Sequence, residues 1–403
     1  MNRSEFSFII VALSRVDSEY SSTALSIAEE LAKNHSVYYV NHPYTYKDLL
    51  KKVRKDTRLK KMYWRLLFRK IVFEKNDRFG FTSIVVPFVL PINWMPKSWI
   101  FDLLHRLNER VVKRSIKLTV RKYRLEKYIF INIFNPYYVG FLPKDFGQAV
   151  SIYQSVDNIS QNSYTLKHGV RLEKQAVSKA DIVFVTSTAL SEKMKSLNER
   201  THIIHNAADF TLFHAAVTKS ARPADVQEIT TRIIGYTGNI DDLRIDFQLL
   251  KEIALRNKDC TLLLVGPVNS HQFFQLGLDQ IENIVSLGPK KIQELPDYLM
   301  QMDVLIIPFM CNSLTASIYP LKINEYLAVG KPVVSTRFSK DIESFEKVIE
   351  IGNSHTEIFS KIDEFLNQEP DETLVDQRIE VARNNTWASR VDQIWTHIEE
   401  YMK

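Results

Sequence analysis

Cysteine and long hydrophobic runs are scarce in this chain, and each shortage excludes classes of protein. The 403 residues contain two cysteines, Cys260 and Cys311, whose spacing fits no metal site or redox motif, so we expect a protein of the reducing cytoplasm. The apolar run near the N-terminus is too short for a secretory signal and is more typical of a buried strand. Prolines interrupt the stretch Phe81–Ile100, which is therefore not expected to cross a membrane as a helix.

Sequence motifs of several common chemistries are also absent. The loop Ser14–Ser22 follows the first strand-like run but lacks the glycines of a dinucleotide fingerprint, and there is no P-loop. No spacing suggests a zinc site or a Ser-His-Asp triad. An Asp-x-Asp pair for a metal-bound diphosphate is missing too, because Asp241 and Asp242 are adjacent and fit an exposed turn. We therefore expect neither a metal site nor a cofactor.

Length and hydrophobic pattern predict two α/β domains. A chain of 403 residues is too long for one ordinary core. Strand-like apolar runs alternate with amphipathic helices, first from Phe6–Leu13 onward and again from Arg232–Tyr236 onward. Such alternation is typical of doubly wound parallel sheets, in which ligands bind at the carboxyl ends of the strands.

Positive charge is concentrated in one part of the chain. Residues 47–127 hold 23 Lys and Arg against 7 Asp and Glu, a net charge of +16, whereas the whole chain carries +6. Basic residues recur there at helical spacing beside aromatic residues, which favours amphipathic helices that bind an anionic membrane surface. A solvated helix face gives the same pattern, and nucleic acid fits the charge although no nucleic-acid-binding module is recognisable. The basic positions are residues 51, 54, 58, 61, 65 and 69, then Arg106, Arg110, Lys113, Lys117, Arg121 and Arg124.

The stretch Ser317–Thr336 predicts an anion site. Pro320 suits the first position of a helix that Gly330 ends. Lys322 and Glu325 are three residues apart and share a face of this helix. A helix N-terminus with a lysine in its first turn suits a diphosphate, and Glu325, one turn deeper, suits sugar hydroxyls. The alternative is an ordinary helix with an exposed Lys-Glu pair.

Three segments carry a family resemblance. They are NEYLAVGKPVVST at 324–336, HNAADFTLF at 205–213, and ADIVFVT at 180–186 followed by a helix. They resemble segments of glycosyltransferases with two Rossmann-like domains (the GT-B fold), specifically the retaining group 1, GT4-like family with a Glu-x7-Glu motif. The resemblance implies that Glu325 holds the nucleotide ribose. Ser317 stands where the first Glu of the motif falls, so recognition of the donor sugar is assigned to other groups.

The resemblance also implies roles for further residues. It places Gly238, Asn239 and Gly266 at the donor site. Lys322 and Arg244 are expected to bind the diphosphate, and Lys290 is expected to lie beside the nucleotide base. Backbone N–H groups around Thr315, Ser317 and Leu321 complete this donor site. Asp157 contacts the acceptor or the donor sugar, or else it caps the next helix. His205 and Asn206 would lie near the cleft, although a satisfied strand-end histidine is the alternative for His205, and Arg244 is alternatively a surface residue.

These patterns together predict a domain plan. Residues 1–210 form an acceptor-binding domain with a basic insert at about 47–127, and residues 211–231 form a linker. Residues 232–384 form the nucleotide-sugar-binding domain, and residues 385–403 form a helix that crosses back to the first domain. In the resembling family the two Rossmann-like domains face each other across a cleft.

The predicted activity is transfer of a sugar, of hexosyltransferase type, from a nucleotide-diphosphate sugar of UDP or GDP type. The expected acceptor is a saccharide, lipid-linked, on the cytoplasmic face of the cell membrane, in cell-surface polysaccharide or glycolipid synthesis. The resemblance implies retention of anomeric configuration without a metal. Two alternatives remain open: a nucleotide-sugar epimerase, and an inactive nucleotide-sugar-binding protein, which Ser317 suggests.

Overall fold

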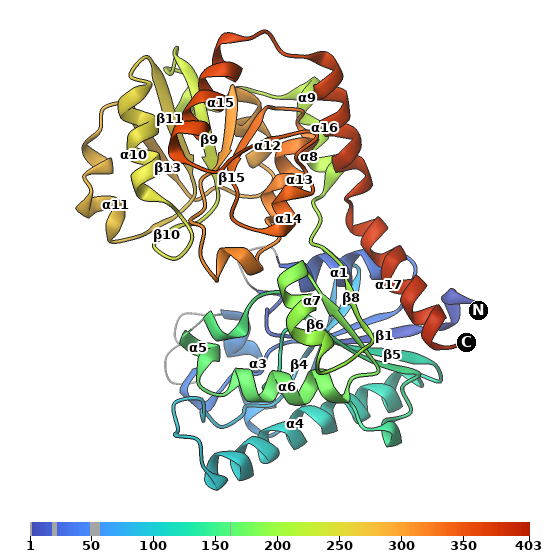
Figure 1. Ribbon diagram of the computed structural model, residues 1–403. Coiled ribbons are helices and arrows are strands. Elements are labelled where there is room, and N and C mark those ends of the chain that lie inside the picture. Colours follow the sequence, from blue (N-terminus) through green and yellow to red (C-terminus); the bar gives the residue numbers. More distant parts are fainter. Residues whose placement is uncertain (1, 18–21, 49–56, 162) are drawn as a thin grey trace. The chain divides into compact units, whose positions relative to one another are not determined.

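The chain folds into two compact α/β units. The computed structural model describes residues 2–17, 22–48, 57–161 and 163–403 (Figure 1). Unit 1 comprises Met1–Ile204 and Val391–Lys403, and unit 2 comprises His205–Arg390. Each unit has its own sheet and its own hydrophobic core.

Unit 1 is built on an eight-stranded sheet in the order β3-β4-β2-β1-β5-β6-β7-β8. Neighbouring strands are parallel, except that β3 runs antiparallel to β4. The central strands are buried along their length, as expected when helices cover both faces of a parallel sheet. The strands are β1 (Ser7–Ala12), β2 (Val37–Val40), β3 (Val72–Asn76), β4 (Phe81–Val85), β5 (Tyr128–Ile133), β6 (Val150–Ser155), β7 (Ile182–Val185) and β8 (Thr201–Ile203).

The helices of unit 1 begin at serine or other polar caps. The Ser22, Ser98 and Ser187 hydroxyls accept backbone N–H groups at the starts of α1, α4 and α7. Figure 1 shows α4 and α6 on one face of the sheet and α1 on the other. Leu190 and Met194 of α7 pack with Ala176 and Val177 of α6, so α7 lies on the same face as α6. The helices are α1 (Thr23–Ala32), α3 (Thr57–Leu67), α4 (Trp99–Tyr123), α5 (Ser163–Leu166), α6 (Gly169–Lys179) and α7 (Thr188–Lys195), with short 3-10 turns η1 (Arg3–Glu5), η2 (Lys144–Phe146) and η3 (Ile159–Gln161).

The basic stretch 47–127 forms part of this unit. It contributes α3, the β3–β4 hairpin and α4, and β4 pairs with β2, so the stretch extends the central sheet. The predicted basic helix Ile100–Arg124 is present as α4. Of the basic positions expected around α3, Lys51 and Arg54 lie outside the described residues. None of the helices in the described ranges is long and apolar enough to span a bilayer.

The C-terminal helix α17 (Trp387–Tyr401) returns to unit 1, which confirms the predicted crossing. Trp395 is 2% exposed, and its ring centroid lies 5.5 Å from that of Phe8 and 5.2 Å from that of His35. At the surface Arg3 Nε donates to Glu399 at 2.8 Å. An aromatic cluster therefore joins the last helix to the first strand.

Unit 2 is built on a six-stranded parallel sheet in the order β13-β11-β9-β14-β15-β16. The chain runs outward from β9 to β13 and then returns to β14 on the other side of β9. The point between β9 and β14 is thus a topological switch point. The strands are β9 (Arg232–Thr237), β11 (Cys260–Val265), β13 (Ile284–Gly288), β14 (Val304–Ile307), β15 (Val333–Thr336) and β16 (Glu350–Gly352), with a small parallel pair of β10 (Ile240–Asp241) and β12 (Val268–Asn269).

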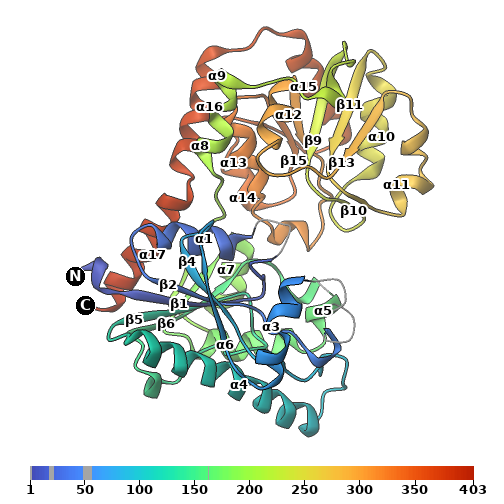
Figure 2. The same cartoon turned by 180° about the vertical axis from the view of Figure 1, so that it is seen from behind.

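Helices flank this second sheet on both sides (Figures 1 and 2). Helix α13 packs with α8 and α16, and Arg256 joins α10 to Asp363 of α15 at 2.9 Å. The helices are α8 (Phe210–His214), α9 (Ala216–Lys219), α10 (Phe247–Arg256), α11 (Gln272–Gln275), α12 (Leu295–Gln301), α13 (Leu321–Ala328), α14 (Lys340–Glu343), α15 (His355–Asn367) and α16 (Glu372–Asn384), with 3-10 turns η4 (Ala224–Val226), η5 (Leu278–Gln280) and η6 (Thr315–Ser317).

The stretch 211–231, which we predict to link two domains, lies within unit 2. It contains most of α8, all of α9 and the turn η4. Phe213 and Val226 are fully buried in the core of this unit. These two side chains anchor the stretch although it has no apolar period.

The aromatic cluster around α17 predicts a large stability effect. Replacing Trp395 with Ala removes a buried ring from contact with Phe6, Phe8 and His35, and we expect the free energy of unfolding to fall by about 3–5 kcal/mol. Denaturant unfolding measures this change. Gln393→Ala, an exposed position on the same helix, is the control. Equal stability of the two variants would contradict the packing of α17.

Candidate functional site

Two glycines bring the loops after β9 and β11 into contact beside the switch point of unit 2. Gly238 and Gly266 have φ values of +135° and +150°. A Cβ placed on Gly266 would lie 1.9 Å from the Gly238 carbonyl oxygen. Only glycine permits this approach. A Cβ on Gly238 would lie 3.2 Å from Lys322 Nζ, so the loop backbone passes directly under that ammonium group.

Lys322, in the first turn of α13, is held without a polar partner. Its Nζ lies 5.1 Å from the ring centroid of Tyr236 and 4.9 Å from that of Phe309. Within the described part of the chain it makes no hydrogen bond and no ion pair. Burial, with the positive charge of Arg244 beside it, lowers the pKa of Lys322 to about 8. The ammonium group is therefore held ready for an anionic ligand.

Glu325 follows one turn deeper and is 7% exposed. Burial raises the pKa of its carboxyl group, although the charge of Lys322 opposes the rise. The two side chains share a face of α13, as predicted, but they lie farther apart than the 4 Å of an ion pair. Glu325 thus keeps free acceptor oxygens at the edge of the site.

The N-terminus of α13 adds hydrogen-bond donors. Pro320 occupies the N-cap position, one residue earlier than the predicted first helical position, and no side chain caps this helix. The N–H groups of Leu321 and Lys322 have no acceptor within the helix. Together with the helix dipole they favour a negatively charged ligand at this end.

Arg244 is only partly available to such a ligand. Its Nε and Nη2 donate to Asp241 Oδ2 at 2.9 and 2.8 Å. Asp241 is 7% exposed and also accepts the backbone N–H groups of Leu243 and Arg244. The expectation of an exposed turn is therefore wrong for Asp241, because its carboxylate organises the loop that presents Arg244.

The hydroxyl groups of Thr315 and Ser317, two predicted site residues, form hydrogen bonds within the loop before α13. Thr315 Oγ1 donates to the Met310 carbonyl, and Ser317 Oγ donates to the Leu314 carbonyl at 2.6 Å. Both side chains are buried. The contribution of this segment to a ligand is therefore expected from its backbone, while the hydroxyls hold its shape.

The remaining predicted residues of unit 2 have defined partners. Asn239 Nδ2 donates to Asp241 at 2.8 Å, and Lys290 pairs with Asp225 at 2.5 Å. The ring of His205 stacks on that of Tyr319 at 4.4 Å between centroids. Asn206 Nδ2 donates to the Tyr319 carbonyl at 3.4 Å. His205 and Asn206 thus support the loop that leads into α13, and Lys290 belongs to a separate cluster.

Asp157 lies in unit 1, exposed, after the carboxyl end of β6. The neighbouring Asn158 side chain accepts the Ser160 backbone N–H group at 3.2 Å. The predicted contact of Asp157 with a sugar stays a prediction.

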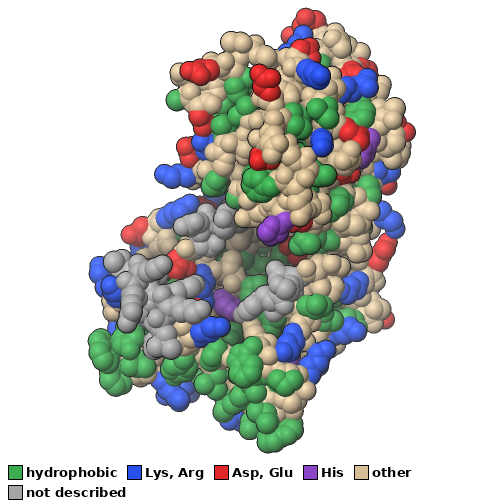
Figure 3. Space-filling view, turned by 90° about the vertical axis from the view of Figure 1, so that its left-hand side faces the viewer, with side chains coloured by type: hydrophobic (Ala, Val, Ile, Leu, Met, Phe, Trp, Pro, Cys, Tyr) green, Lys and Arg blue, Asp and Glu red, His purple; other side chains and the backbone are tan. Residues whose placement is uncertain are grey.

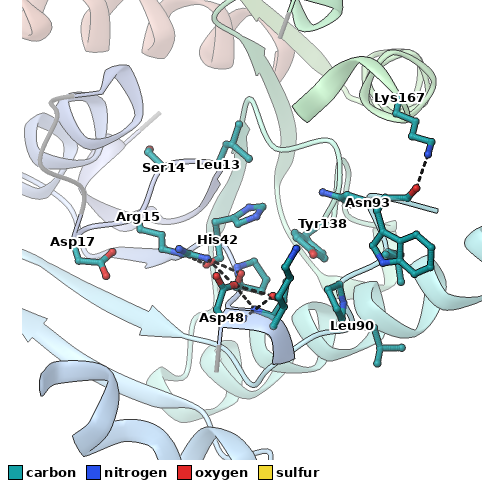
Figure 4. A pocket seen from close by; sticks show the side chains of 16 residues that line it. Leu13, Ser14, Arg15, Asp17, His42, Asp48, Leu90, Asn93, Tyr138 and Lys167 are labelled. Carbon is teal, nitrogen blue, oxygen red and sulfur yellow. Dashed lines mark hydrogen bonds and ion pairs between the residues drawn. The ribbon is translucent and has the colours of Figure 1, made fainter. Parts of the chain in front are cut away.

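A cavity of about 910 Å³ opens at the carboxyl ends of the strands in unit 1. The loops after β1, β2, β4 and β5 line it (Figure 4). Arg15 donates to the carbonyls of His42 and Pro43 at 2.9 and 3.0 Å. Leu90 and Tyr138 supply apolar wall. This mixture of apolar surface and convergent polar groups is typical of a ligand pocket.

His42 is a neutral donor in this cavity. Asn135 Nδ2 lies 3.3 Å from His42 Nδ1, and because an amide N–H group only donates, Nδ1 is the acceptor and Nε2 carries the proton. Burial, with Arg15 nearby, lowers the pKa of His42 to about 3. The imidazole therefore offers an N–H group and no charge near neutral pH.

Backbone strain is stored in the loop that carries Asn135 and Tyr138. Phe134 and Val139 have φ values of +54° and +56°, and a β-branched residue rarely adopts this conformation. Asn132 Nδ2 holds the turn by donating to the carbonyls of Asn135 and Val139, each at 2.9 Å. Strain that the surroundings hold in place is frequent at functional sites.

Sequence reasoning missed several residues of both sites. Tyr236 and Phe309 are strand-end aromatic residues that look like core, and their contact with Lys322 is visible only in three dimensions. In unit 1, Arg15 lies in the polar loop Ser14–Ser22, which carries no recognisable binding motif. His42 and Tyr138 carry no local signal.

Comparison with known proteins agrees with this picture. Residues 231–368 match the family Glycosyl transferases group 1. A region of 241 residues is 30% identical to TuaH of Bacillus subtilis (strain 168), which is named as a teichuronic acid biosynthesis glycosyltransferase. The match covers 57% of this chain and 60% of TuaH, so the chain spans about three fifths of this curated relative.

Solved structures share the fold over nearly the whole chain. Sucrose-phosphate synthase from Thermosynechococcus elongatus has a TM-score of 0.65 at 14% identity, with 98% of each chain covered. The α,α-trehalose 6-phosphate synthase from Burkholderia multivorans has a TM-score of 0.66 at 8% identity, again with 98% of each chain covered. Anabaena HepE, solved in complex with UDP-glucose, has a TM-score of 0.58 at 14% identity, covering 98% of this chain and 99% of HepE.

The two Rossmann-like sheets define a protein of the GT-B fold, as predicted. Within unit 2, residues 231–368 are the part of the chain that matches the group 1 glycosyltransferases.

The contact between the glycine loops predicts a sensitive position. Gly266→Ala would place a methyl group against the Gly238 backbone at a strained φ, and we expect about 1–3 kcal/mol of lost stability. Gly288→Ala is the matched control, because Gly288 also has a positive φ, of +68°, but nothing lies within 4 Å of its Cβ position. Thermal unfolding compares the two. If both variants unfold alike, the close approach of the loops is not a structural requirement.

Proposed function

We propose that this protein transfers a sugar from a nucleotide-diphosphate sugar to a saccharide acceptor. The observation that carries the proposal is Lys322, an ammonium group with no polar partner among the described residues, held over two rings at the uncapped N-terminus of α13. It lies at the switch point of a group 1 glycosyltransferase unit.

Each group at this site has a task in breaking the sugar–phosphate bond. Negative charge grows on the departing diphosphate, and Lys322, the α13 N–H groups and the helix dipole oppose it at fixed positions. Arg244 adds positive charge, and the carboxylate of Asp241 orients the Arg244 side chain. Glu325 accepts hydrogen bonds from the ribose hydroxyls. A UDP or GDP sugar fits these groups, and the complex of HepE with UDP-glucose supports the UDP form. We propose that the transferred group is a hexosyl group and that transfer proceeds with retention and without a metal; the match of residues 231–368 to group 1 glycosyltransferases supports retention.

Unit 1 is the proposed acceptor domain, and its cavity is the proposed acceptor site. The His42 Nε2–H group is its proposed polar contact with sugar hydroxyls. Asp157, which is not among the residues that line this cavity, is a separate proposed sugar contact. The name of TuaH supports an acceptor that belongs to a cell-surface polysaccharide. We further propose that the basic residues of 47–127 place the enzyme on the inner, cytoplasmic face of the cell membrane.

Turnover separates this proposal from its two alternatives. With UDP- and GDP-sugars and a lipid-linked acceptor, the transferase releases nucleoside diphosphate faster when the acceptor is present. An epimerase yields a new sugar isomer without releasing nucleotide. Tight binding of the nucleotide sugar with no product of either kind identifies a binding protein, in line with Ser317 in place of Glu, and overturns the proposal.

The lowered pKa of Lys322 predicts that the protein takes up protons when it binds a nucleotide, and calorimetry detects this uptake. Burial lowers the pKa of Lys322 toward the neutral range, and a bound diphosphate favours the charged form, so we expect proton uptake when UDP binds near pH 8. Lys322→Met should abolish the uptake and weaken binding about 10- to 100-fold. Titrations in two buffers of different ionisation enthalpy measure both effects.

Lys258→Met is the control for this experiment, since Lys258 is an exposed lysine of the same unit. If Lys322→Met binds UDP and GDP as tightly as Lys258→Met, the diphosphate does not bind at α13.

A further inference from the structure

Helix α4 leaves an unusual set of large apolar side chains in solvent. Its buried side packs on the sheet through residues such as Phe101, Val112 and Ile116. At the N-terminal end of the opposite side, Trp99 is 74% exposed and Leu103 is 49% exposed. Ile100 and Leu107 are exposed beside them. Exposed apolar residues gathered in this way mark an interaction site.

The same side of α4 becomes cationic along its length. Residues 106, 110, 114, 117 and 121 recur at three- and four-residue spacing, in register with Trp99 and Leu103, and all are exposed. The acidic residues of α4 do not neutralise this side, because Asp102 pairs with Arg171 and Glu109 pairs with Lys113. Lys117 contacts Asp145 at 3.6 Å. The other four, Arg106, Arg110, Arg114 and Arg121, have no ion-pair partner among the described residues.

The apolar end of α4 continues into the wall of the unit 1 cavity. Trp94 lines the cavity and is still 72% exposed. Two contacts fix its loop against the helix layer: Lys167 Nζ donates to the Trp94 carbonyl at 2.5 Å, and His168 Nε2 lies 2.9 Å from the Met95 carbonyl. His168 in turn stacks on Phe101 of α4 at 3.6 Å between ring centroids. The cavity rim and the start of α4 are therefore one connected piece.

Helix α3 and the turn that follows it carry the same combination of side chains. Trp64 and Phe68 are 63% and 68% exposed and stack at 6.1 Å between ring centroids. Lys61, Arg65 and Arg69 are exposed around them. Figure 3 shows hydrophobic side chains gathered beside Lys and Arg over the part of the surface that belongs to unit 1.

We propose that these residues form a membrane-docking surface at which the cavity of unit 1 opens. We call it the α4 surface: Trp94, Trp99, Ile100, Leu103 and Leu107, with Arg106, Arg110, Arg114, Lys117 and Arg121. Its occupant is the headgroup region of an anionic lipid leaflet. Tryptophan and aliphatic side chains enter the interface, and the arginines contact lipid phosphates. Because Trp94 belongs to both surface and cavity, the ligand of the cavity is the saccharide head of an amphiphile anchored in that leaflet.

Charge complementarity selects this occupant. A soluble protein partner would need an acidic, apolar patch of its own, whereas a leaflet supplies negative charge and apolar depth side by side. The inference rests on the proposed function for the acceptor's identity, but lipid binding itself does not depend on it.

Sedimentation of the full chain with vesicles tests the docking. We expect binding to phosphatidylcholine vesicles that contain phosphatidylglycerol, weaker binding as salt rises, and little binding to phosphatidylcholine alone. The apolar variant Trp99→Ser/Leu103→Ser and the charge variant Arg106→Gln/Arg110→Gln/Arg114→Gln should each lose at least about tenfold in affinity. Equal binding to both kinds of vesicle, or wild-type binding by both variants, overturns the proposal.

Matched controls come from unit 2. Leu255→Ser/Phe274→Ser replaces two exposed apolar residues, 47% and 55% exposed, and Lys258→Gln/Lys291→Gln/Lys347→Gln removes three basic charges. Both controls should bind vesicles like the wild type. If the controls lose as much binding as the α4 variants, adsorption is nonspecific and the α4 surface is rejected.

Two further measurements separate the remaining outcomes. Vesicles with brominated acyl chains should quench tryptophan emission, and Trp94→Phe/Trp99→Phe should lose most of that quenching; unchanged quenching excludes insertion at the cavity rim. A dimer in analytical ultracentrifugation that Trp99→Ser/Leu103→Ser dissociates would show that a second copy covers the surface, and would overturn the proposal. UDP binding by Trp99→Ser/Leu103→Ser, measured by calorimetry, tests the donor site separately from the membrane.

Discussion

The approach of Gly266 to Gly238 is the constraint on which the donor site depends. With any side chain at position 266, the loops after β9 and β11 would separate, and the backbone under Lys322 would move. The lysine then lies against the rings of Tyr236 and Phe309, and no carboxylate of the described residues forms an ion pair with it. An ammonium group kept this way costs folding energy, since burial disfavours its charge. In the proposed function, a bound diphosphate would offset that cost, since it favours the charged form of Lys322.

In unit 1, a strained turn likewise holds the groups of the cavity in place. A turn with Phe134 and Val139 at positive φ is held by Asn132, and this turn presents Asn135 to His42 and Tyr138 to the cavity. The result is a pocket whose polar groups are fixed before any ligand arrives, so little ordering cost remains for binding. Polar donors beside aromatic and aliphatic wall suit the two faces of a sugar ring. The exposed aromatic residues around the rim suggest why a cavity for a polar ligand is framed by so much apolar surface.

Local patterns predict most of the fold because buried parallel strands and amphipathic helices are local features. The β1 and β9 runs, α13 with Lys322 and Glu325 on one face, and the returning α17 all follow from periodicity, caps and the family resemblance. Side-chain partners do not follow in this way. Asp241 looked like a turn residue but is buried beneath Arg244, and the hydroxyls of Thr315 and Ser317 turn inward to carbonyls of their own loop. The unit 1 cavity is formed by loops that are distant in sequence. No local sequence pattern predicts that Val139 has a positive φ.

The central claim is that the first turn of α13 binds the diphosphate of a nucleotide. A crystal structure of the protein with bound UDP tests it most directly. We expect diphosphate oxygens within hydrogen-bond distance of Lys322 Nζ and of the Leu321 and Lys322 N–H groups, with the ribose hydroxyls on Glu325. A diphosphate bound elsewhere, with Lys322 still packed against Tyr236 and Phe309 and touching no ligand, would contradict it.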